Sequence, residues 1–323
     1  MDILKIENGI LVECDEMAQG QIIIPDTVSV IGEGAFAGCK KIRSVILPDS
    51  VIEISEGAFF DCDNLNEIQL SSGLKRIETE AFSYCRRLKA VRIPSTVEYI
   101  GEGIFGDCHS LEHIYVDPEN LYYYSEGNCI IEKYSETLIA GCKTTKIPYG
   151  VTRIGAWAFS GCMLRSIDLP GSVTEICGSA FCNCISLRAL YIPSSINHID
   201  SRAFSHCVGL ETICVDPENE RYDSREDCNG IVQNDTLILG CKNTVIPESV
   251  TVIGSFAFDG SDIRYLDLSH IRKIEKGAFW FCRLLKEASL PNVDDIPGFA
   301  FASCESMAAV NIPYRTQVSR TAF

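Results

Sequence analysis

One repeated unit accounts for nearly all of this chain. The stretch from Cys39 to Phe59, CKKIRSVILPDSVIEISEGAF, reads C-x-x-I-x-x-V-x-L-P-x-x-V-x-x-I-x-x-x-A-F, and close copies return about every 23 residues. A unit this short cannot bury its own apolar residues, so each copy must stack on its neighbours. The sequence therefore predicts a solenoid of stacked coils.

An Ala-Phe dipeptide marks most copies, and we call its phenylalanine the marker phenylalanine. Marker phenylalanines occur at Phe36, Phe59, Phe82, Phe159, Phe181, Phe204, Phe258, Phe279, Phe301 and Phe323, with Phe105 after Ile104 as a variant. Two intervals, Phe105 to Phe159 and Phe204 to Phe258, are longer than one repeat. Each long interval must hold an additional segment.

The apolar positions of a coil have distinct roles. Ile42, Val45 and Leu47 alternate and include β-branched residues, which predicts a short strand that pairs in parallel with its copies. Val51 and Ile54 then point inward from a second side of the coil. Glycine directly after isoleucine, as in Ile31-Gly32, Ile100-Gly101, Ile154-Gly155 and Ile253-Gly254, indicates a tight bend at positive φ.

The long intervals both begin with VDPEN, at 116–120 and 215–219. We expect this pentapeptide to form a turn, because Pro fixes φ and Asp or Asn accepts local hydrogen bonds. Two apolar runs around a polar turn follow, at 128–142 and 229–241, and predict a β-hairpin in each interval. A third copy opens the chain, and both ends resemble cuts through a longer array.

The predicted plan is one solenoid domain over 1–323, without a linker that would divide it. Hairpin units lie near 1–24, 117–147 and 216–246, and coils fill 25–116, 148–215 and 247–323.

The pattern I-P-x-x-V-x-x-I-G-x-x-A-F-x-x-C-x-x-L-x-x-I resembles the BspA-like, or Treponema-type, bacterial leucine-rich repeat. The segment from Ile24-Pro25 to Val45 is a nearly complete instance, and the hairpin cores Thr137–Ile139 and Thr236–Ile238 are also similar to that family. The resemblance implies a β-rich α/β solenoid: a right-handed superhelix with one parallel strand per coil and inserted hairpins. It further implies a surface or secreted protein of host-associated bacteria that acts in adhesion and protein binding.

Composition narrows the partners and the location. The formal charge of −16 repels phosphate backbones, so we expect no nucleic-acid partner. No apolar run is long enough to span a bilayer, so we expect no transmembrane segment. The first 20 residues lack the basic and apolar regions of a signal peptide. The location stays open between the cytoplasm, if this N-terminus is native, and the cell surface that the resemblance implies.

Cysteine is the residue type that most suggests chemistry, with 17 in the chain. Nine follow a marker phenylalanine by three residues, at Cys39, Cys62, Cys85, Cys108, Cys162, Cys184, Cys207, Cys282 and Cys304, and Ser261 takes this place in one coil. We interpret them as a packing ladder, because a thiol behaves as a small buried hydrophobe.

Two other cysteine arrangements are alternatives to a packing role. A zinc site around Cys182 and Cys184 lacks a second converging pair. Disulfides Cys129–Cys142 and Cys228–Cys241 are open alternatives for an oxidising compartment, although aligning the two hairpins does not make these pairs equivalent. No catalytic, calcium or phosphate-loop motif is present, so we expect no catalytic residues, cofactor or metal.

The outward strand positions form the natural binding surface of a solenoid. The predicted binding face comprises Arg92, His113, Tyr115, Arg188, Tyr191 and Tyr265, because Tyr and Arg combine apolar area with hydrogen bonding. Tyr122, Tyr123 and Tyr124 form a second candidate patch. The sequence thus favours a non-enzymatic scaffold that binds a protein, including a host protein. A carbohydrate or matrix adhesin is the alternative within binding, and a cysteine- or metal-dependent enzyme is the alternative of another class.

Overall fold

The computed structural model describes residues 3–323 and consists almost entirely of short β-strands. The chain forms two compact units: unit 1 ends at Met163, and unit 2 begins at Leu164. The one helical segment among the described residues is the 3₁₀ turn η1 (Arg225–Asp227). The β-rich solenoid is therefore confirmed, while the helical part of the predicted α/β class is reduced to a single turn.

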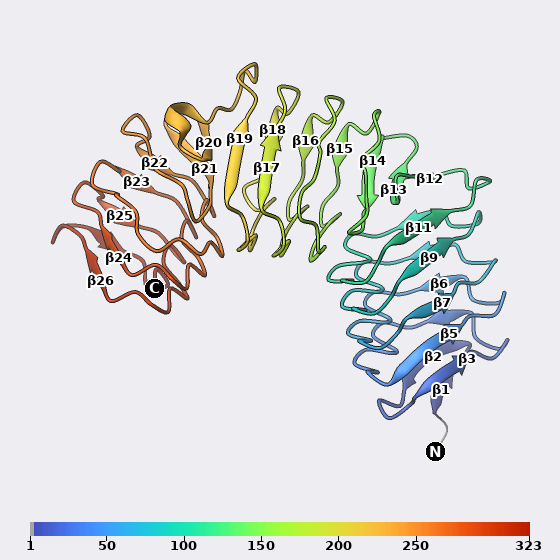
Figure 1. Ribbon diagram of the computed structural model, residues 1–323. Helices are drawn as coiled ribbons and strands as arrows, with labels where there is room; N and C mark the ends of the chain where they lie inside the picture. The colour runs from blue at the N-terminus through green and yellow to red at the C-terminus, as the bar shows by residue number, and fades with distance from the viewer. Residues whose placement is uncertain (1–2) are drawn as a thin grey trace. The chain divides into compact units, whose positions relative to one another are not determined.

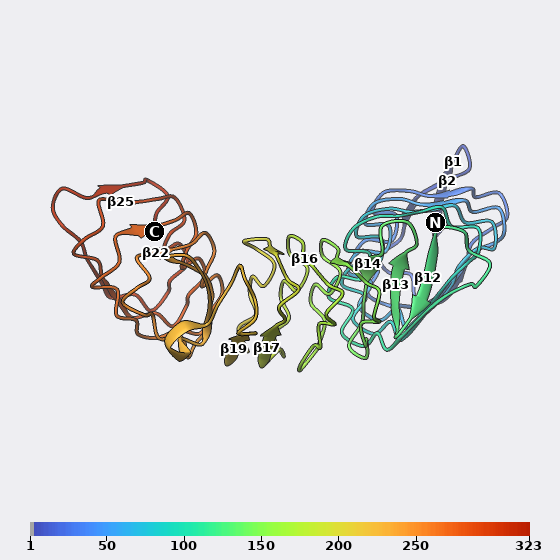
Figure 2. The same ribbon diagram turned by 90° about the horizontal axis from the view of Figure 1, so that it is seen from above.

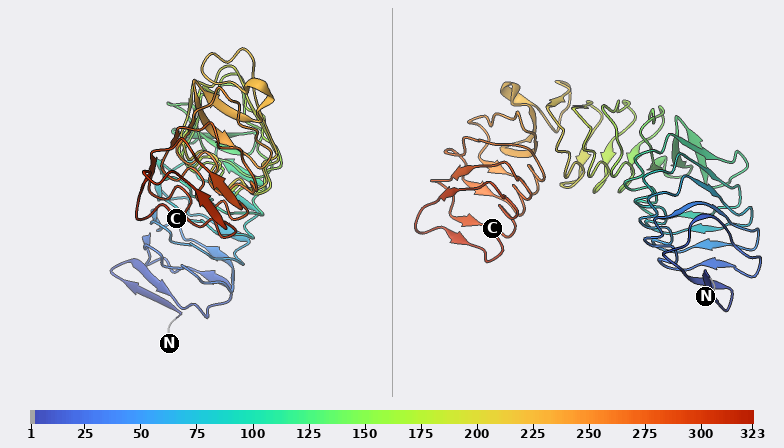
Figure 3. Two further views of the ribbon diagram at one scale, coloured as in Figure 1. Left: turned by 90° about the vertical axis from the view of Figure 1, so that its left-hand side faces the viewer. Right: turned by 60° about the horizontal axis from the view of Figure 1, so that its bottom comes forward.

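Unit 1 contains two columns of parallel strands plus hairpin strands (Figures 1 and 3). The long-strand column is β3 (Gly20–Ile23), β5 (Ile42–Ile46), β7 (Glu67–Gln69), β9 (Ala90–Ile93) and β11 (His113–Val116). The short-strand column is β4 (Val30–Ile31), β6 (Glu53–Ile54), β8 (Arg76–Ile77), β10 (Tyr99–Ile100) and β15 (Arg153–Ile154). The hairpin strands are β1 (Leu4–Glu7), β2 (Ile10–Cys14), β12 (Tyr123–Glu126), β13 (Cys129–Glu132) and β14 (Thr137–Ala140).

Unit 2 repeats this arrangement. Its long strands are β17 (Ala189–Ile192), β19 (Thr212–Val215), β24 (Glu287–Ser289) and β26 (Ala309–Asn311). Its short strands are β16 (Glu175–Ile176), β18 (His198–Ile199), β22 (Val252–Ile253), β23 (Lys273–Ile274), β25 (Asp295–Ile296) and β27 (Gln317–Val318). Its hairpin is β20 (Gly230–Gln233) with β21 (Thr236–Gly240). In both units long strands of neighbouring coils pair in parallel, as Val45 does with Ile68, but the column is divided into separate sheets, β3-β5-β7 and β9-β11 in unit 1 and β17-β19 and β24-β26 in unit 2.

Most marker phenylalanines lie in a turn in which the residues two before and two after the phenylalanine have positive φ, whereas around Phe204 only His206 does. Around Phe59, Gly57 and Asp61 have φ of 56° and 57°. The N–H groups of Gly57, Phe59 and Asp61 donate to carbonyl oxygens of the next coil at 3.1, 2.9 and 3.0 Å. At these turns every second backbone N–H bonds to the next coil. These hydrogen bonds join successive coils in addition to those of the long-strand and short-strand columns.

The prediction of positive φ at the Ile-Gly pairs is wrong. Gly32 and Gly101 lie outside the left-handed region. A Cβ atom at Gly32 would lie 2.7 Å from the carbonyl oxygen of Leu11, and one at Gly101 would lie 2.4 Å from the amide nitrogen of Thr79. Glycine is needed at these positions because the backbones of neighbouring coils approach closely there.

The marker phenylalanines form the core of each unit. Phe59 is fully buried and stacks on Phe36 at 4.8 Å and on Phe82 at 5.3 Å between ring centroids. In unit 2, Phe279 stacks on Phe258 at 5.2 Å and on Phe301 at 5.1 Å. Figure 2 looks along unit 1, where successive coils lie behind one another around this interior.

The cysteine ladder packs in the core and also makes hydrogen bonds. The thiol of Cys62 donates to the carbonyl oxygen of Phe36 at 3.1 Å, and Cys85 and Cys282 repeat this contact with Phe59 and Phe258 at 3.2 and 3.0 Å. Ser261 is the ladder residue without sulfur, and its buried hydroxyl has no partner among the described residues. The shorter C–O bond leaves this hydroxyl farther from the preceding coil than a thiol would be.

The three predicted hairpins are present. β1 pairs antiparallel with β2, β13 with β14, and β20 with β21. The strand β12 adds to β13, so the second hairpin unit has three strands. The last strand of each hairpin also belongs to the short-strand column. β2, β14 and β21 pair in parallel with the short strands β4, β15 and β22.

The hairpin coils have no phenylalanine in the marker position. In the second hairpin coil Gly141 takes this position. Its N–H donates to the carbonyl oxygen of Ala158 in the next coil, just as the N–H of Phe59 donates to that of Ala81. A Cβ atom at Gly141 would lie 2.0 Å from the ring of Phe159. The ring of the following coil therefore fills the space above this glycine, and Gly240 has the same relation to Phe258.

Candidate functional site

The exposed face of β9 and β11 in unit 1 brings three predicted binding residues together. The register places Tyr115 beside Arg92 and His113 beside Ala90, and side chains on both strands alternate between exposed and buried. The guanidinium of Arg92 lies 4.5 Å from the ring centroid of Tyr115, a cation–π contact. Tyr115 is 40% exposed, and no carboxylate pairs with Arg92 in the part of the chain that the structure describes. We call Arg92, His113 and Tyr115 the β9–β11 face.

Arg188 and Tyr191 of unit 2 are exposed but engaged by neighbours. Arg188 donates to the carbonyl oxygen of Gly209 at 3.0 Å and lies 3.6 Å from Glu211. Tyr191 donates its hydroxyl hydrogen to Asp216 at 2.8 Å, and this hydrogen bond raises the pKa of the phenol. Their polar groups are already used within the molecule, which makes them weaker candidates than Arg92.

Tyr265, the sixth predicted residue, lies on a segment of unit 2 without assigned strand structure, between β22 and β23. Its side chain is 58% exposed, and the ammonium of Lys286 lies 5.2 Å from its ring centroid. Tyr265 therefore presents an aromatic surface outside the ordered strand face.

The second predicted patch does not form. Tyr123 is 4% exposed, and its hydroxyl accepts a hydrogen bond from the backbone N–H of Ile100 at 3.0 Å. Only Tyr122 of the three is exposed, at 37%. The middle tyrosine fixes the hairpin unit to the preceding coil, as Tyr222 does through Ile199 at the equivalent place in unit 2.

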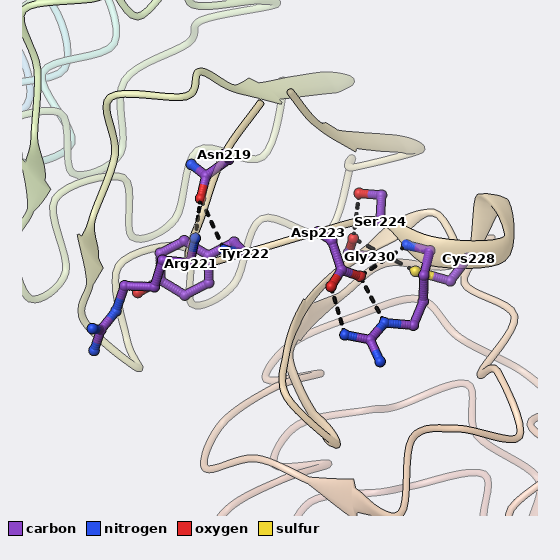
Figure 4. A network of polar contacts seen from close by, with 8 residues as sticks. Asn219, Arg221, Tyr222, Asp223, Ser224, Cys228 and Gly230 are labelled. Atoms are coloured by element: carbon purple, nitrogen blue, oxygen red, sulfur yellow. Dashed lines mark hydrogen bonds and ion pairs between the residues drawn. The ribbon is translucent and has the colours of Figure 1, made fainter. Parts of the chain in front are cut away.

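The asparagine of each VDPEN segment anchors a hairpin unit. Asn219 is buried, and its amide donates to the carbonyl oxygens of Pro193 at 2.8 Å and Ile196 at 3.0 Å. Its carbonyl oxygen accepts from the N–H groups of Arg221 and Tyr222 at 2.9 and 2.8 Å, as Figure 4 shows. Asn120 makes the same four kinds of contact in unit 1. These segments are structural turns, as expected.

The hairpin that Asn219 anchors carries a second polar cluster (Figure 4). Arg225 pairs with Asp223 through two nitrogens, and this ion pair lowers the pKa of Asp223. Ser224 donates to the carbonyl oxygen of Gly230 at 2.7 Å and accepts from the N–H of Val215 at 3.0 Å. These contacts hold the segment before β20 against β19 and leave no open polar site there.

Most of the ladder cysteines show no sign of activation. The pKa of Cys39 is lowered by its hydrogen bond with the thiol of Cys14, but Cys39 is fully buried. All 17 are present as thiols. Burial raises the pKa of Cys85, Cys162 and Cys282, and it raises the pKa of Cys304 to about 12. A nucleophilic cysteine needs a lowered pKa and access to solvent, so these ladder thiols have the opposite properties.

The two cysteine pairs of the hairpins are indeed not equivalent. Cys142 and Cys241 correspond, because each donates to the carbonyl oxygen of an asparagine, Asn128 or Asn229, at 3.4 or 3.7 Å. Cys129 follows its asparagine, whereas Cys228 precedes it. Cys129 donates instead to the carbonyl oxygen of Glu126 at 2.9 Å.

The remaining polar side chains of the described residues include a close contact between His206 and Asp259. Among residues 3–323, no group of three or more His, Cys, Asp or Glu side chains is placed to hold a metal ion. Nδ1 of His206 lies 3.2 Å from Oδ1 of Asp259. The neighbouring hydroxyls of Ser205 and Ser261 have no hydrogen-bond partner in the described chain, so neither is activated by this histidine.

Unit 2 also contains a cluster of aromatic side chains that the repeat pattern does not predict. Phe256, Trp280 and Phe299 follow one another at centroid distances of 6.0 and 5.8 Å. Phe256 and Phe299 lie two residues before a marker phenylalanine, at a position that is glycine in Gly34, Gly57, Gly103 and Gly277. Comparing the copies at this single position would have revealed the substitution of glycine by aromatic residues.

Stacked parallel strands, a buried ladder of repeated residues and a variable exposed strand face define a leucine-rich-repeat solenoid. The family model of the BspA type leucine rich repeat region matches six copies, over residues 5–130, 130–226 and 238–323. The chain belongs to this family. No curated protein matches the sequence. In the part of the chain that the structure describes, no helix has the length and hydropathy needed to cross a membrane.

Three solved structures of leucine-rich repeat proteins are similar to this chain. A leucine-rich repeat protein from Eubacterium ventriosum is 20% identical, with a TM-score of 0.58 over 98% of this chain and 88% of that one. A leucine rich cell surface protein from Faecalibacterium prausnitzii is 21% identical over 94% and 80% of the two chains, with a TM-score of 0.44. A leucine-rich repeat protein from Bacteroides ovatus is 24% identical over 93% and 74%, with a TM-score of 0.43. At these identities the first similarity defines the fold alone.

Proposed function

We propose that this chain is a non-enzymatic scaffold for protein–protein interaction and that the β9–β11 face is its principal contact surface. The observation that carries the proposal is the exposed Arg92–Tyr115 pair, held in register by two paired strands. Arginine and tyrosine dominate the energetics of protein interfaces because they supply apolar area and directed hydrogen bonds together. Arg188, Tyr191 and Tyr265 form a separate proposed contact surface on unit 2.

Other features of the chain support a binding role over catalysis. The repeated residues are used for stacking, and the ladder thiols of Cys85, Cys162 and Cys282 are buried with raised pKa values. The family supports location at the cell surface and contact with a host protein, which are part of the proposal. A carbohydrate or matrix ligand is the second candidate, since Tyr115 and Tyr191 expose 40% and 48% of their surface.

The test replaces the pair on the β9–β11 face and measures ligand capture. We expect Arg92→Glu combined with Tyr115→Ala to lower binding of the full chain to its best ligand on an array of extracellular host proteins by at least about tenfold. The matched control is Arg76→Glu with Tyr99→Ala, because this exposed pair has the same cation–π contact at 4.4 Å but belongs to the short strands.

Three outcomes are distinguishable in this experiment. Loss of binding in the β9–β11 variant alone supports the proposed surface. Equal loss in both variants, or no loss in either, would contradict it. Strong binding to a glycan array with no protein captured would replace the protein-binding scaffold with the carbohydrate adhesin.

A further inference from the structure

Unit 2 carries an aromatic surface that includes none of the six residues of the proposed contact. We call Phe256, Trp280 and Phe299 the aromatic ladder. Successive rings lie 6.0 and 5.8 Å apart and are tilted by 50° and 41°. Phe256 and Trp280 are partly exposed and Phe299 is 39% exposed, so the ladder forms a continuous apolar strip in contact with solvent.

The backbone under the ladder is strained in a way that the fold does not require. Phe256 and Phe299 have φ of 59° and 60°, in the left-handed region that disfavours bulky residues. Gly57 and Gly277 occupy the same repeat position at similar φ. Since glycine serves in these coils, the phenylalanines lower the stability of their turns without a benefit to stacking. Because Tyr84 and Trp157 adopt similar φ elsewhere in the chain, the inference rests on the contacts between these rings and not on φ alone.

One of those glycines also makes room for the ladder. A Cβ atom at Gly277 would lie 2.4 Å from Cε1 of Phe256, so the ring of Phe256 lies across this glycine. The ring thereby reaches Trp280 of the next coil. The absence of a side chain at Gly277 thus allows the ring of Phe256 to contact that of Trp280, and the strip is continuous.

Two cations complete the surface. The guanidinium of Arg202 lies 4.4 Å from the ring centroid of Phe256 and 5.3 Å from that of Trp280, and the ammonium of Lys276 lies 5.8 Å from that of Phe299. Both side chains are exposed, and no carboxylate forms an ion pair with either one within residues 3–323. In a chain of net charge −16, both charged groups that lie over these rings are cations.

We propose that the aromatic ladder, with Arg202 and Lys276, binds an acidic segment of a protein partner that also carries apolar side chains. Carboxylates of the segment pair with the two cations, and its apolar residues pack on the ring edges. The tilted rings with cations over their faces do not offer the flat platform on which a sugar would stack. This inference rests on the proposed binding function and adds a second surface to it.

The probe is a library of random 12-residue peptides displayed on phage, selected on the immobilised full chain. Enriched peptides are then synthesised with a fluorescein label, and their affinities are measured by polarisation. We expect the enriched peptides to combine Asp or Glu with aromatic or aliphatic residues. Their affinity should fall at least about tenfold in Phe256→Gly/Phe299→Gly and in Arg202→Glu/Lys276→Glu, and it should weaken as salt is raised.

Glycine is chosen because it relieves the strained φ, so the melting temperature of Phe256→Gly/Phe299→Gly should stay equal or rise. Trp157→Gly is the matched control: Trp157 has φ of 58° at the same repeat position in unit 1 and is 41% exposed. Peptide affinity should be unchanged in Trp157→Gly and in Arg92→Glu/Tyr115→Ala.

Several results would overturn the inference. They are an absence of enriched peptides, enrichment without acidic residues, and affinities that the ladder variants leave unchanged. If the full chain self-associates and Phe256→Gly/Phe299→Gly removes this self-association, the aromatic ladder binds a second copy of the chain instead. If the ladder binds a sulfated oligosaccharide and no peptides, the ligand is a carbohydrate. If peptide binding depends on Arg92 and Tyr115 alone, the ladder proposal fails while the proposed function stands.

Discussion

Replacing Phe59 by alanine is expected to destabilise unit 1 by about 3–5 kcal/mol. The ring is fully buried and stacks on both Phe36 and Phe82, so truncation removes apolar burial and leaves a cavity between three coils. The measurement is urea unfolding of the full chain, followed by hydrogen exchange at the backbone amides of Phe36 and Phe82. We expect both amides to lose protection because the stability of a repeat depends on contacts with its neighbours.

Phe60 provides the control for this experiment. It is the next residue in the chain and has the same side chain, but it is 36% exposed and contacts Tyr84 at 5.1 Å. Phe60→Ala should cost only about 1 kcal/mol or less. Equal destabilisation by the two substitutions would show that the marker phenylalanines are not the core of the stack.

Replacing Asn219 by alanine is expected to destabilise unit 2 by about 2–4 kcal/mol, since buried groups without hydrogen-bond partners are costly. The substitution removes the hydrogen-bond partner of four backbone groups. These are the carbonyl oxygens of Pro193 and Ile196 and the N–H groups of Arg221 and Tyr222. The hairpin β20–β21 follows this anchor directly, so hydrogen exchange should accelerate there first. Urea unfolding and exchange at the amides of Ile231 and Val232 measure the effect.

Asn292→Ala is the matched control in the same unit. Asn292 is exposed and makes one hydrogen bond, donating to the carbonyl oxygen of Ser269 at 2.7 Å. Its loss should cost about 1 kcal/mol or less. A small effect of Asn219→Ala would contradict the role of the VDPEN segment as an anchor.

Much of the fold could be predicted from the repeat because buried positions recur with the coil. The strand expected from Ile42 to Leu47 is β5, and the inward second side at Ile54 is β6. The left-handed positions could not be predicted, because Gly57, Asp61 and Tyr84 all adopt positive φ. Their conformation follows from hydrogen bonds between coils and is not marked by glycine alone.

The candidate site was only partly predictable. The repeat alone placed Tyr115 beside Arg92, because equivalent positions of successive coils must pair. The hydrogen bond from Tyr191 to Asp216 could not be predicted, because the repeat does not specify where the side chain of Asp216 points. The aromatic ladder escaped prediction because it combines two repeat positions, one before and one after a marker phenylalanine.

The central claim is that repeated residues form the buried stack and that function is left to the exposed variable positions. Thiol labelling of the native chain, resolved by mass spectrometry, tests it at many coils in one experiment. Cys214, which is exposed, should react fastest, and the buried ladder thiols Cys62, Cys85, Cys207 and Cys282 should react at least about 100-fold more slowly, through opening of the stack. Ladder cysteines that label as fast as Cys214 under native conditions would contradict the account.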